Sequence, residues 1–111
     1  MTGFNASLGL ARTPEGDGLV LETRPEHEAF PGVVHFAVLA ALAEIAAGDS
    51  VGASVAPTAV SVQLMKRART GRLLAHGRLL RRGRTLAFAE GEVSQDGQLV
   101  AKATVTFALL Q

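Results

Sequence analysis

The chain has 111 residues, no cysteine, and nearly balanced charge, with 11 Lys and Arg against 10 Asp and Glu. This length predicts one domain over residues 1–111, and the cysteine count excludes disulfides, thiolate metal sites and cysteine nucleophiles. No apolar run reaches the roughly 18 residues of a membrane span, and none follows a positively charged leader. We therefore expect a cytoplasmic protein with no signal peptide and no membrane association.

Two strands are predicted at the start of the chain, over residues 4–11 and 18–24. The residues between them, 13–18, are rich in Pro, Gly and Asp, which is typical of a hairpin turn. Residues 25–32 are predicted to form a loop, and Pro31 suits a position at or just before the first turn of a helix.

The next segment, residues 34–47, predicts a helix that is apolar on nearly every side. Its only polar side chains are those of His35 and Glu44, and Gly48 is expected to cap its C-terminus. A helix that faces water has one polar face, so this helix must be enclosed by the rest of the protein. A carboxyl group in its middle is costly unless it is paired, hydrogen-bonded or functional.

Four more strands are predicted after the helix, over residues 53–67, 72–80, 85–94 and 98–110. The turns between them are short, at residues 70–71, 81–84 and 95–97, so consecutive strands must be antiparallel. The predicted class is α+β, with one antiparallel sheet wrapped around the helix. Such a sheet has two edges, and we expect a homodimer that pairs them edge to edge.

A sequence motif runs from His35 to Leu42-Ala-Glu-Ile-Ala46 and places Glu44 nine positions after the histidine. This motif resembles that of the phenylacetate-degradation type of acyl-CoA thioesterases, in which His-Gly-Gly precedes Leu-Ala-acid-x-Ala. Residues 63–71 also look like the strand and basic-Gly turn of that family, and the likeness covers roughly the whole chain. The resemblance implies a hotdog fold, in which about five to six antiparallel strands wrap one long central helix.

The motif departs from the family pattern at several positions. Phe36 and Ala37 stand at the two glycines, and Ala29 and Phe30 occupy the neighbourhood of a frequent Asn or Gln. Gly48 stands four residues after Glu44, where some relatives have a hydroxyl. The missing glycines and the missing Asn favour an alternative function on the same fold, a non-catalytic binding or regulatory module for acyl-CoA or a fatty acyl group.

Glu44 is the candidate catalytic residue for hydrolysis of a thioester. Its carboxylate could deprotonate a water molecule or attack the carbonyl carbon directly, and the sequence does not choose between these roles. The backbone N–H groups of Phe36 and Ala37, at the helix start, are the candidate oxyanion donors. His35 is a candidate for orienting the entry loop or the substrate, and a structural histidine is the alternative. Glu44 itself could instead be a structural carboxylate.

The spacing of these groups predicts a site shared by two subunits. Phe36 and Glu44 are eight residues apart, which is about 12 Å along a helix axis. One carbonyl carbon cannot lie within reach of both. If both groups act on it, they come from different subunits of a homodimer, or of a tetramer made from two such dimers.

Most basic residues fall between positions 66 and 84, and no Asp or Glu lies between Asp49 and Glu90. Arginines at the strand ends of this region could bind the phosphates of CoA, which is substrate and not cofactor, so no cofactor is expected. The alternative is solvated edge charge, and the balanced total charge disfavours nucleic acid. Three histidines without ligand spacing predict no metal site. The candidate CoA-binding residues are Arg67, Arg69, Arg81, Arg82 and Arg84.

Overall fold

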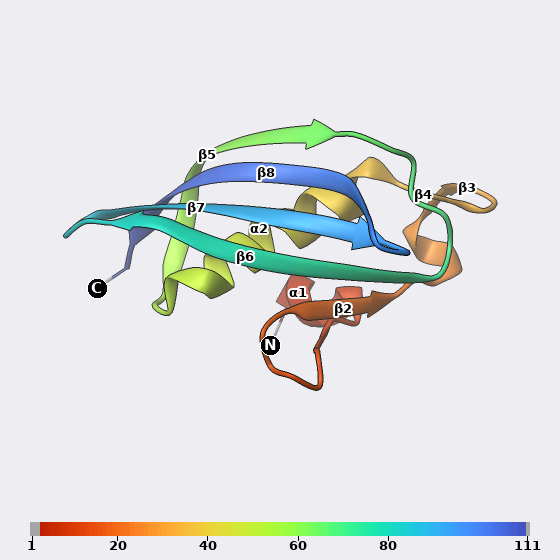
Figure 1. Ribbon diagram of the computed structural model, residues 1–111, viewed down its shortest axis with the longest axis horizontal. Helices are drawn as coiled ribbons and strands as arrows, with labels where there is room; N and C mark the ends of the chain where they lie inside the picture. Colours follow the sequence, from red (N-terminus) through yellow and green to blue (C-terminus); the bar gives the residue numbers. More distant parts are fainter. Residues whose placement is uncertain (1–2, 111) are drawn as a thin grey trace.

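The computed structural model describes residues 3–110, which form one long helix and a curved sheet (Figure 1). The elements are α1 (Gly3–Leu8), β1 (Ala11–Arg12), β2 (Leu19–Glu22), a 3-10 turn η1 (Pro25–His27), β3 (Glu28–Phe30), β4 (Val33–Val34), α2 (Phe36–Val51), β5 (Val55–Leu64), β6 (Arg72–Arg82), β7 (Leu86–Gln95) and β8 (Gln98–Leu109).

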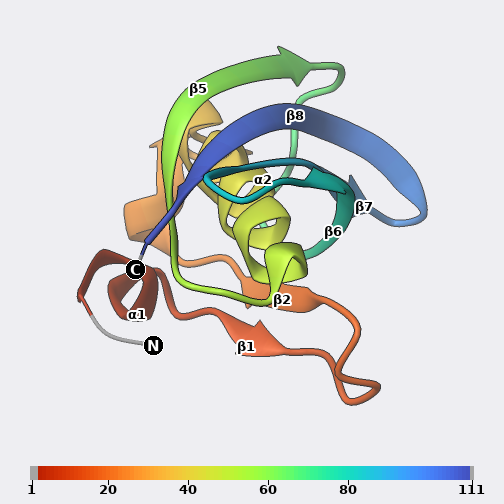
Figure 2. The same cartoon turned by 90° about the vertical axis from the view of Figure 1, so that its left-hand side faces the viewer.

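The main sheet has six strands in the order β1-β2-β6-β7-β8-β5, and every neighbouring pair is antiparallel. β3 and β4 form a separate two-stranded ribbon. Figure 2 shows the main sheet curving around α2, with β5 at one edge. The predicted α+β architecture and the number of strands are confirmed.

Small side chains let α2 lie close to the sheet. The buried face of α2 includes Ala43, Ala46 and Ala47, and the strands present alanines to it. Ala75 of β6 and Ala89 of β7 are among these strand alanines, and each is at most 1% exposed. Larger apolar residues such as Phe107 fill the rest of the core. The interior is therefore well packed although the helix lies close to the sheet.

The ends of α2 differ from the prediction. The helix begins after His35, so Pro31 lies in the β3–β4 ribbon and not at the first turn. Gly48 is inside the helix, where a Cβ would lie 3.4 Å from the Phe107 ring, so its small size serves packing. Gly52 is the actual C-cap, with a φ of 74° that glycine adopts at no steric cost.

The first predicted strand is also wrong, because residues 3–8 form helix α1. Only Ala11 and Arg12 pair with β2, although the hairpin itself is confirmed. The Ser7 hydroxyl donates to the Phe4 carbonyl within α1, and Leu8 is buried. The segment contains no β-branched residue, so local propensity does not favour a strand there.

Two other boundaries move. β6 continues to Arg82, so Arg81 and Arg82 belong to the strand and not to the following turn. β5 covers only residues 55–64 of the predicted 53–67, and its pairing with β8 shifts at Pro57. The turn at Asp96 and Gly97 is as predicted, with both φ angles positive, as a tight hairpin requires.

One side of α2 is only partly covered by the chain. Ala40, Ala41, Glu44 and Ile45 are half-buried, and Phe36 is 59% exposed. The enclosure expected for such an apolar helix is therefore incomplete in one chain. Within residues 3–110, no helix is long and apolar enough to cross a membrane.

Candidate active site

Glu44 lies in the middle of α2, among the half-buried residues that the chain covers only in part. Among residues 3–110, no side chain donates a hydrogen bond or forms an ion pair to its carboxylate. Burial raises the pKa of this carboxyl above its ordinary value. A half-buried carboxylate with no partner and a raised pKa is suited to accept a proton.

The carboxylate borders a hollow of about 300 Å³ at the C-terminal half of α2. Most of the lining residues were not predicted as part of a site, because they come from α1, β1, β2, the second half of α2 and the chain after the helix. They are Asn5, Arg12, Leu19, Ile45, Gly48, Asp49, Ala53 and Val55. Arg12 and Asp49 are 37 positions apart in sequence, and no local pattern could have paired them.

Arg12 and Asp49 form a two-bond ion pair beside this hollow. Nη1 of Arg12 donates to Oδ2 of Asp49 at 3.0 Å, and Nη2 donates to Oδ1 at 2.5 Å. The bonds from Arg12 hold the pKa of the Asp49 carboxyl below its ordinary value. The arginine in the hollow is therefore bound to Asp49, and Glu44 has no cation bound to it.

His35 is the N-cap of α2. Its Nδ1 accepts a hydrogen bond of 3.0 Å from the Ala37 N–H, and its ring stacks on the Phe36 ring with centroids 4.7 Å apart. One of the two candidate oxyanion donors, the Ala37 N–H, is thus already hydrogen-bonded in this chain. Within the described residues, the Phe36 N–H has no acceptor.

A second hollow, of about 280 Å³, lies beside the helix start. Its lining combines Phe36 with residues from the end of β5 and the loop after it, and two of them are basic. The lining residues are Val34, Phe36, Leu39, Leu64, Met65, Lys66, Arg67 and Ala68. Neither Glu44 nor Asp49 lines this hollow. Within a single chain, the helix start and the Glu44 carboxylate therefore border different hollows, as their spacing of about 12 Å predicts.

The five predicted CoA-binding arginines do not come together in one chain. Arg67 lies beside the helix start, and Arg69 pairs with Asp96 at the β7–β8 turn, at 2.7 Å. The other three arginines lie around the distal end of β6, where Arg82 donates to the Val51 carbonyl at 3.3 Å. β6 alone spans about 33 Å at the usual rise per residue, so the two groups are far apart.

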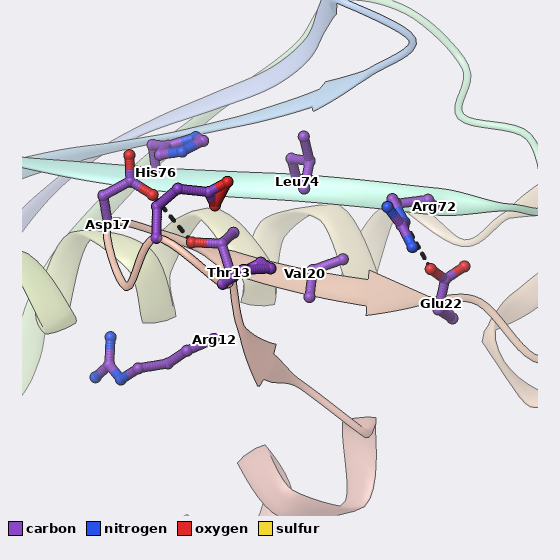
Figure 3. Close-up of a pocket in the computed structure, with 10 residues that line it drawn as sticks. Arg12, Thr13, Asp17, Val20, Glu22, Arg72, Leu74 and His76 are labelled. Carbon is purple, nitrogen blue, oxygen red and sulfur yellow. Dashed lines mark hydrogen bonds and ion pairs between the residues drawn. The ribbon is translucent and has the colours of Figure 1, made fainter.

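A larger hollow, of about 650 Å³, lies between the first hairpin and β6 (Figure 3). Val20 and Leu74 line it, and they alternate with buried neighbours, so this hollow is on the sheet face opposite α2. Arg72 pairs with Glu22 here at 2.6 Å. None of the predicted site residues lines it. Among residues 3–110, no cluster of His, Asp and Glu could hold a metal ion.

Residues 24–108 match the family model described as the acyl-CoA thioesterase N-terminal domain. The chain belongs to this family. The matched residues include the whole of α2 and nearly all of the sheet that wraps it, so the resemblance inferred from the His35–Ala46 motif is confirmed. No curated protein matches the chain.

Solved structures agree with the family. A phenylacetic acid degradation-related protein from Ralstonia eutropha is 27% identical, with a TM-score of 0.80 over 94% of this chain and 87% of that one. A protein from Bacillus halodurans, solved with CoA, is 24% identical, with a TM-score of 0.85 over 99% and 78%. A thioesterase from Haemophilus influenzae is 18% identical, with a TM-score of 0.82 over 96% and 81%. The hotdog fold of this thioesterase domain is confirmed.

Proposed function

We propose that this thioesterase domain hydrolyses an acyl-CoA, with Glu44 as the catalytic carboxylate. The observation that carries the proposal is the Glu44 carboxylate itself, which is half-buried, has no partner among residues 3–110 and has a raised pKa. A structural carboxylate in this position would be expected to accept hydrogen bonds. The family to which the chain belongs supplies the substrate class.

The chemistry requires a base or nucleophile and a donor to the developing oxyanion. Glu44 takes a proton from water, which attacks the thioester carbonyl carbon, or attacks that carbon itself to form an anhydride that water then opens. In both routes the C–S bond breaks, and the CoA thiolate leaves and takes up a proton. The Phe36 N–H, at the positive end of the helix dipole, is the proposed oxyanion donor.

The proposed site lies between two subunits of a homodimer. Glu44 and Phe36 are too far apart in one helix to act on one carbonyl carbon. Among residues 3–110, no strand pairs with the outer side of the edge strand β5, and Val60 and Leu64 are about half exposed, 48% and 51%. A second copy paired at this edge would cover them and bring its own helix near.

The CoA part of the substrate is proposed to lie over the arginines. Lys66 and Arg67 already border the hollow at the helix start. The other candidates for binding the phosphates of CoA are Arg69, Arg81, Arg82 and Arg84. Arg69 lies near one end of β6 and the other three near its opposite end, so the two groups would come from different subunits. The CoA held by the Bacillus halodurans neighbour supports this ligand class for the fold.

A non-catalytic acyl-CoA-binding module is the second candidate. It is favoured by the hydrogen bond from the Ala37 N–H to His35, which leaves one oxyanion donor where the thioesterases of the phenylacetate-degradation type are expected to have two. Such a module would bind the same ligand at the same hollows without hydrolysing it.

Hydrolysis of a panel of acyl-CoAs, from acetyl to palmitoyl and phenylacetyl, separates the two candidates. The wild type should release CoA thiol from at least one of them, and Glu44→Gln should lower kcat by about 10²-fold or more. Glu92→Gln is the matched control, because that carboxylate is half exposed on β7 and should leave kcat unchanged. Binding by calorimetry without any turnover would support the module instead.

A further inference from the structure

The hollow beside Glu44 contains three charged groups. Two are carboxylates of α2, Glu44 and Asp49, and the third is the Arg12 guanidinium from β1. The other elements that line the hollow contribute no charge, since α1 supplies Asn5 and the rest are apolar or glycine. The electrostatics of Glu44 in this chain therefore depend on which carboxylate holds the one cation.

Asp49 holds that cation. The guanidinium and the carboxylate meet through two roughly parallel hydrogen bonds, the geometry in which arginine and a carboxylate fit best. Asp49 is five residues after Glu44, which places it about 7.5 Å further along the helix axis. Gly48, between them, also lines the hollow.

The competition matters because of what an arginine would do to a catalytic base. A carboxylate paired with a guanidinium is a weaker base and a weaker nucleophile, since its charge is stabilised. It is also sterically occupied, because the fork of the guanidinium covers both oxygens. If Asp49 were absent, the carboxylate left for Arg12 in this hollow would be Glu44.

We propose that Asp49 is a positioning residue, which holds Arg12 away from Glu44 and so keeps the Glu44 carboxylate free to act. This inference rests on the proposed thioesterase function. It assigns a role to an ion pair that lies outside the His35–Ala46 motif, and it makes the N-terminal segment 3–12 part of the site.

The test measures the Glu44 titration directly, by ¹³C NMR of the side-chain carboxyl in uniformly labelled protein, assigned with Glu44→Gln. In Asp49→Asn, the midpoint for Glu44 should fall by about one pH unit or more, the size expected for an opposite charge within reach. In Asp49→Asn with Arg12→Gln, the midpoint should return to the wild-type value. Asp49→Glu, which keeps the pair, should leave it near wild type.

A purely structural ion pair predicts another pattern. Asp49→Asn, Arg12→Gln and the double variant would then lose stability alike, and the Glu44 midpoint would stay constant in all three. That result would overturn the proposal. Because the titration needs no substrate, the proposed role of Asp49 is tested independently of turnover.

Activity supplies the second readout. If the wild type hydrolyses an acyl-CoA, the acidic limb of kcat/KM against pH should shift down in Asp49→Asn and return in the double variant. An inactive wild type would contradict the proposed function, while the NMR midpoints would still decide the role of Asp49.

Discussion

Gly77 and Gly91 face each other across β6 and β7, and both lie against the backbone of α2. A Cβ on Gly77 would lie 1.9 Å from the Ala46 carbonyl oxygen, and one on Gly91 would lie 1.9 Å from the Ala43 carbonyl oxygen. The two glycines therefore let successive turns of the helix rest directly on the sheet. This contact sets the depth of α2 against the sheet, and with it the position of Glu44 on the same helix.

Gly77→Ala and Gly91→Ala should each destabilise the fold by about 3 kcal/mol, at the upper end for overpacking, because the obstacle is backbone and cannot rotate away. Gly83→Ala is the matched control, since its Cβ would lie 3.4 Å from the nearest atom and its φ is not positive. That variant should stay within about 0.5 kcal/mol of wild type in urea unfolding. Equal losses at all three positions would show that helix contact is not the cause.

Much of the fold could be predicted from the sequence because its signals are local. The apolar run around Glu44 predicts the long helix, and the short turns after it predict that the four following strands are antiparallel. The role of Gly77 and Gly91 could not be predicted, because a glycine in a strand does not reveal that a helix carbonyl lies above it. The strand predicted over residues 4–11 is wrong because helix α1 depends on contacts that are not local: Leu8 is buried, and Arg24 donates to the Ser7 carbonyl.

The candidate site was predicted only in part for the same reason. Glu44 and His35 belong to one local motif, but Arg12 reaches Asp49 across 37 positions of sequence. The basic stretch read as one cluster because its residues are close in sequence. An extended strand separates them in space, with Arg67 and Arg82 towards opposite ends of β6.

Glu44→Gln should change stability in a pH-dependent way. Burial raises the pKa of Glu44 in the folded state, so ionising it disfavours folding. The wild type should lose stability as the pH rises from the unfolded pKa, about 4.3, through the raised folded value. The variant lacks this loss, so its advantage over wild type should be larger at about pH 8 than at about pH 4.

Urea unfolding at those two pH values, at one fixed protein concentration, measures this difference. An advantage that is the same at both pH values would contradict the raised pKa.

Substitution of Glu90 should change stability with pH in the opposite direction to substitution of Glu44. Its carboxylate accepts from Arg78 at 2.9 and 2.5 Å and lies 3.3 Å from Lys102, and these cations lower its pKa. Its contribution to stability is present above the unfolded pKa and is lost as the pH falls through the folded value. Glu90→Gln should therefore lower the free energy of unfolding at neutral pH and change it little in acid.

Glu92→Gln is the comparison for Glu90→Gln, because the Glu92 carboxylate is 49% exposed and 3.8 Å from Lys102. It should change the free energy of unfolding little at either pH, as exposed ion pairs usually do. A larger effect at Glu92 than at Glu90 would contradict the assignment of the network to Glu90.

Phe36→Pro tests the proposed oxyanion donor without breaking the helix. Phe36 is the first residue of α2, where proline is well tolerated, and His35 already has the extended backbone that precedes proline (φ −65°, ψ 139°). The substitution removes one N–H, and kcat should fall by about 10²-fold or more. Phe36→Ala keeps the N–H and should retain most of kcat, so equal losses in both variants would assign the effect to the ring.

A mixture of two inactive variants tests whether the site is shared. In Glu44→Gln the helix start is intact, and in Phe36→Pro the carboxylate is intact. If each site takes Glu44 from one subunit and Phe36 from the other, every hybrid dimer has one complete site. Unfolding and refolding an equal mixture makes half of the dimers hybrids, so about a quarter of wild-type activity should return.

A site built within one subunit gives no such recovery, because no subunit in the mixture carries both groups. Mixing each variant with the double variant Phe36→Pro, Glu44→Gln is the control, since neither mixture can assemble a complete site. Sedimentation velocity on the same samples should show dimers or larger assemblies throughout, as the unpaired edge of β5 predicts. Monomers with full wild-type activity would contradict a shared site.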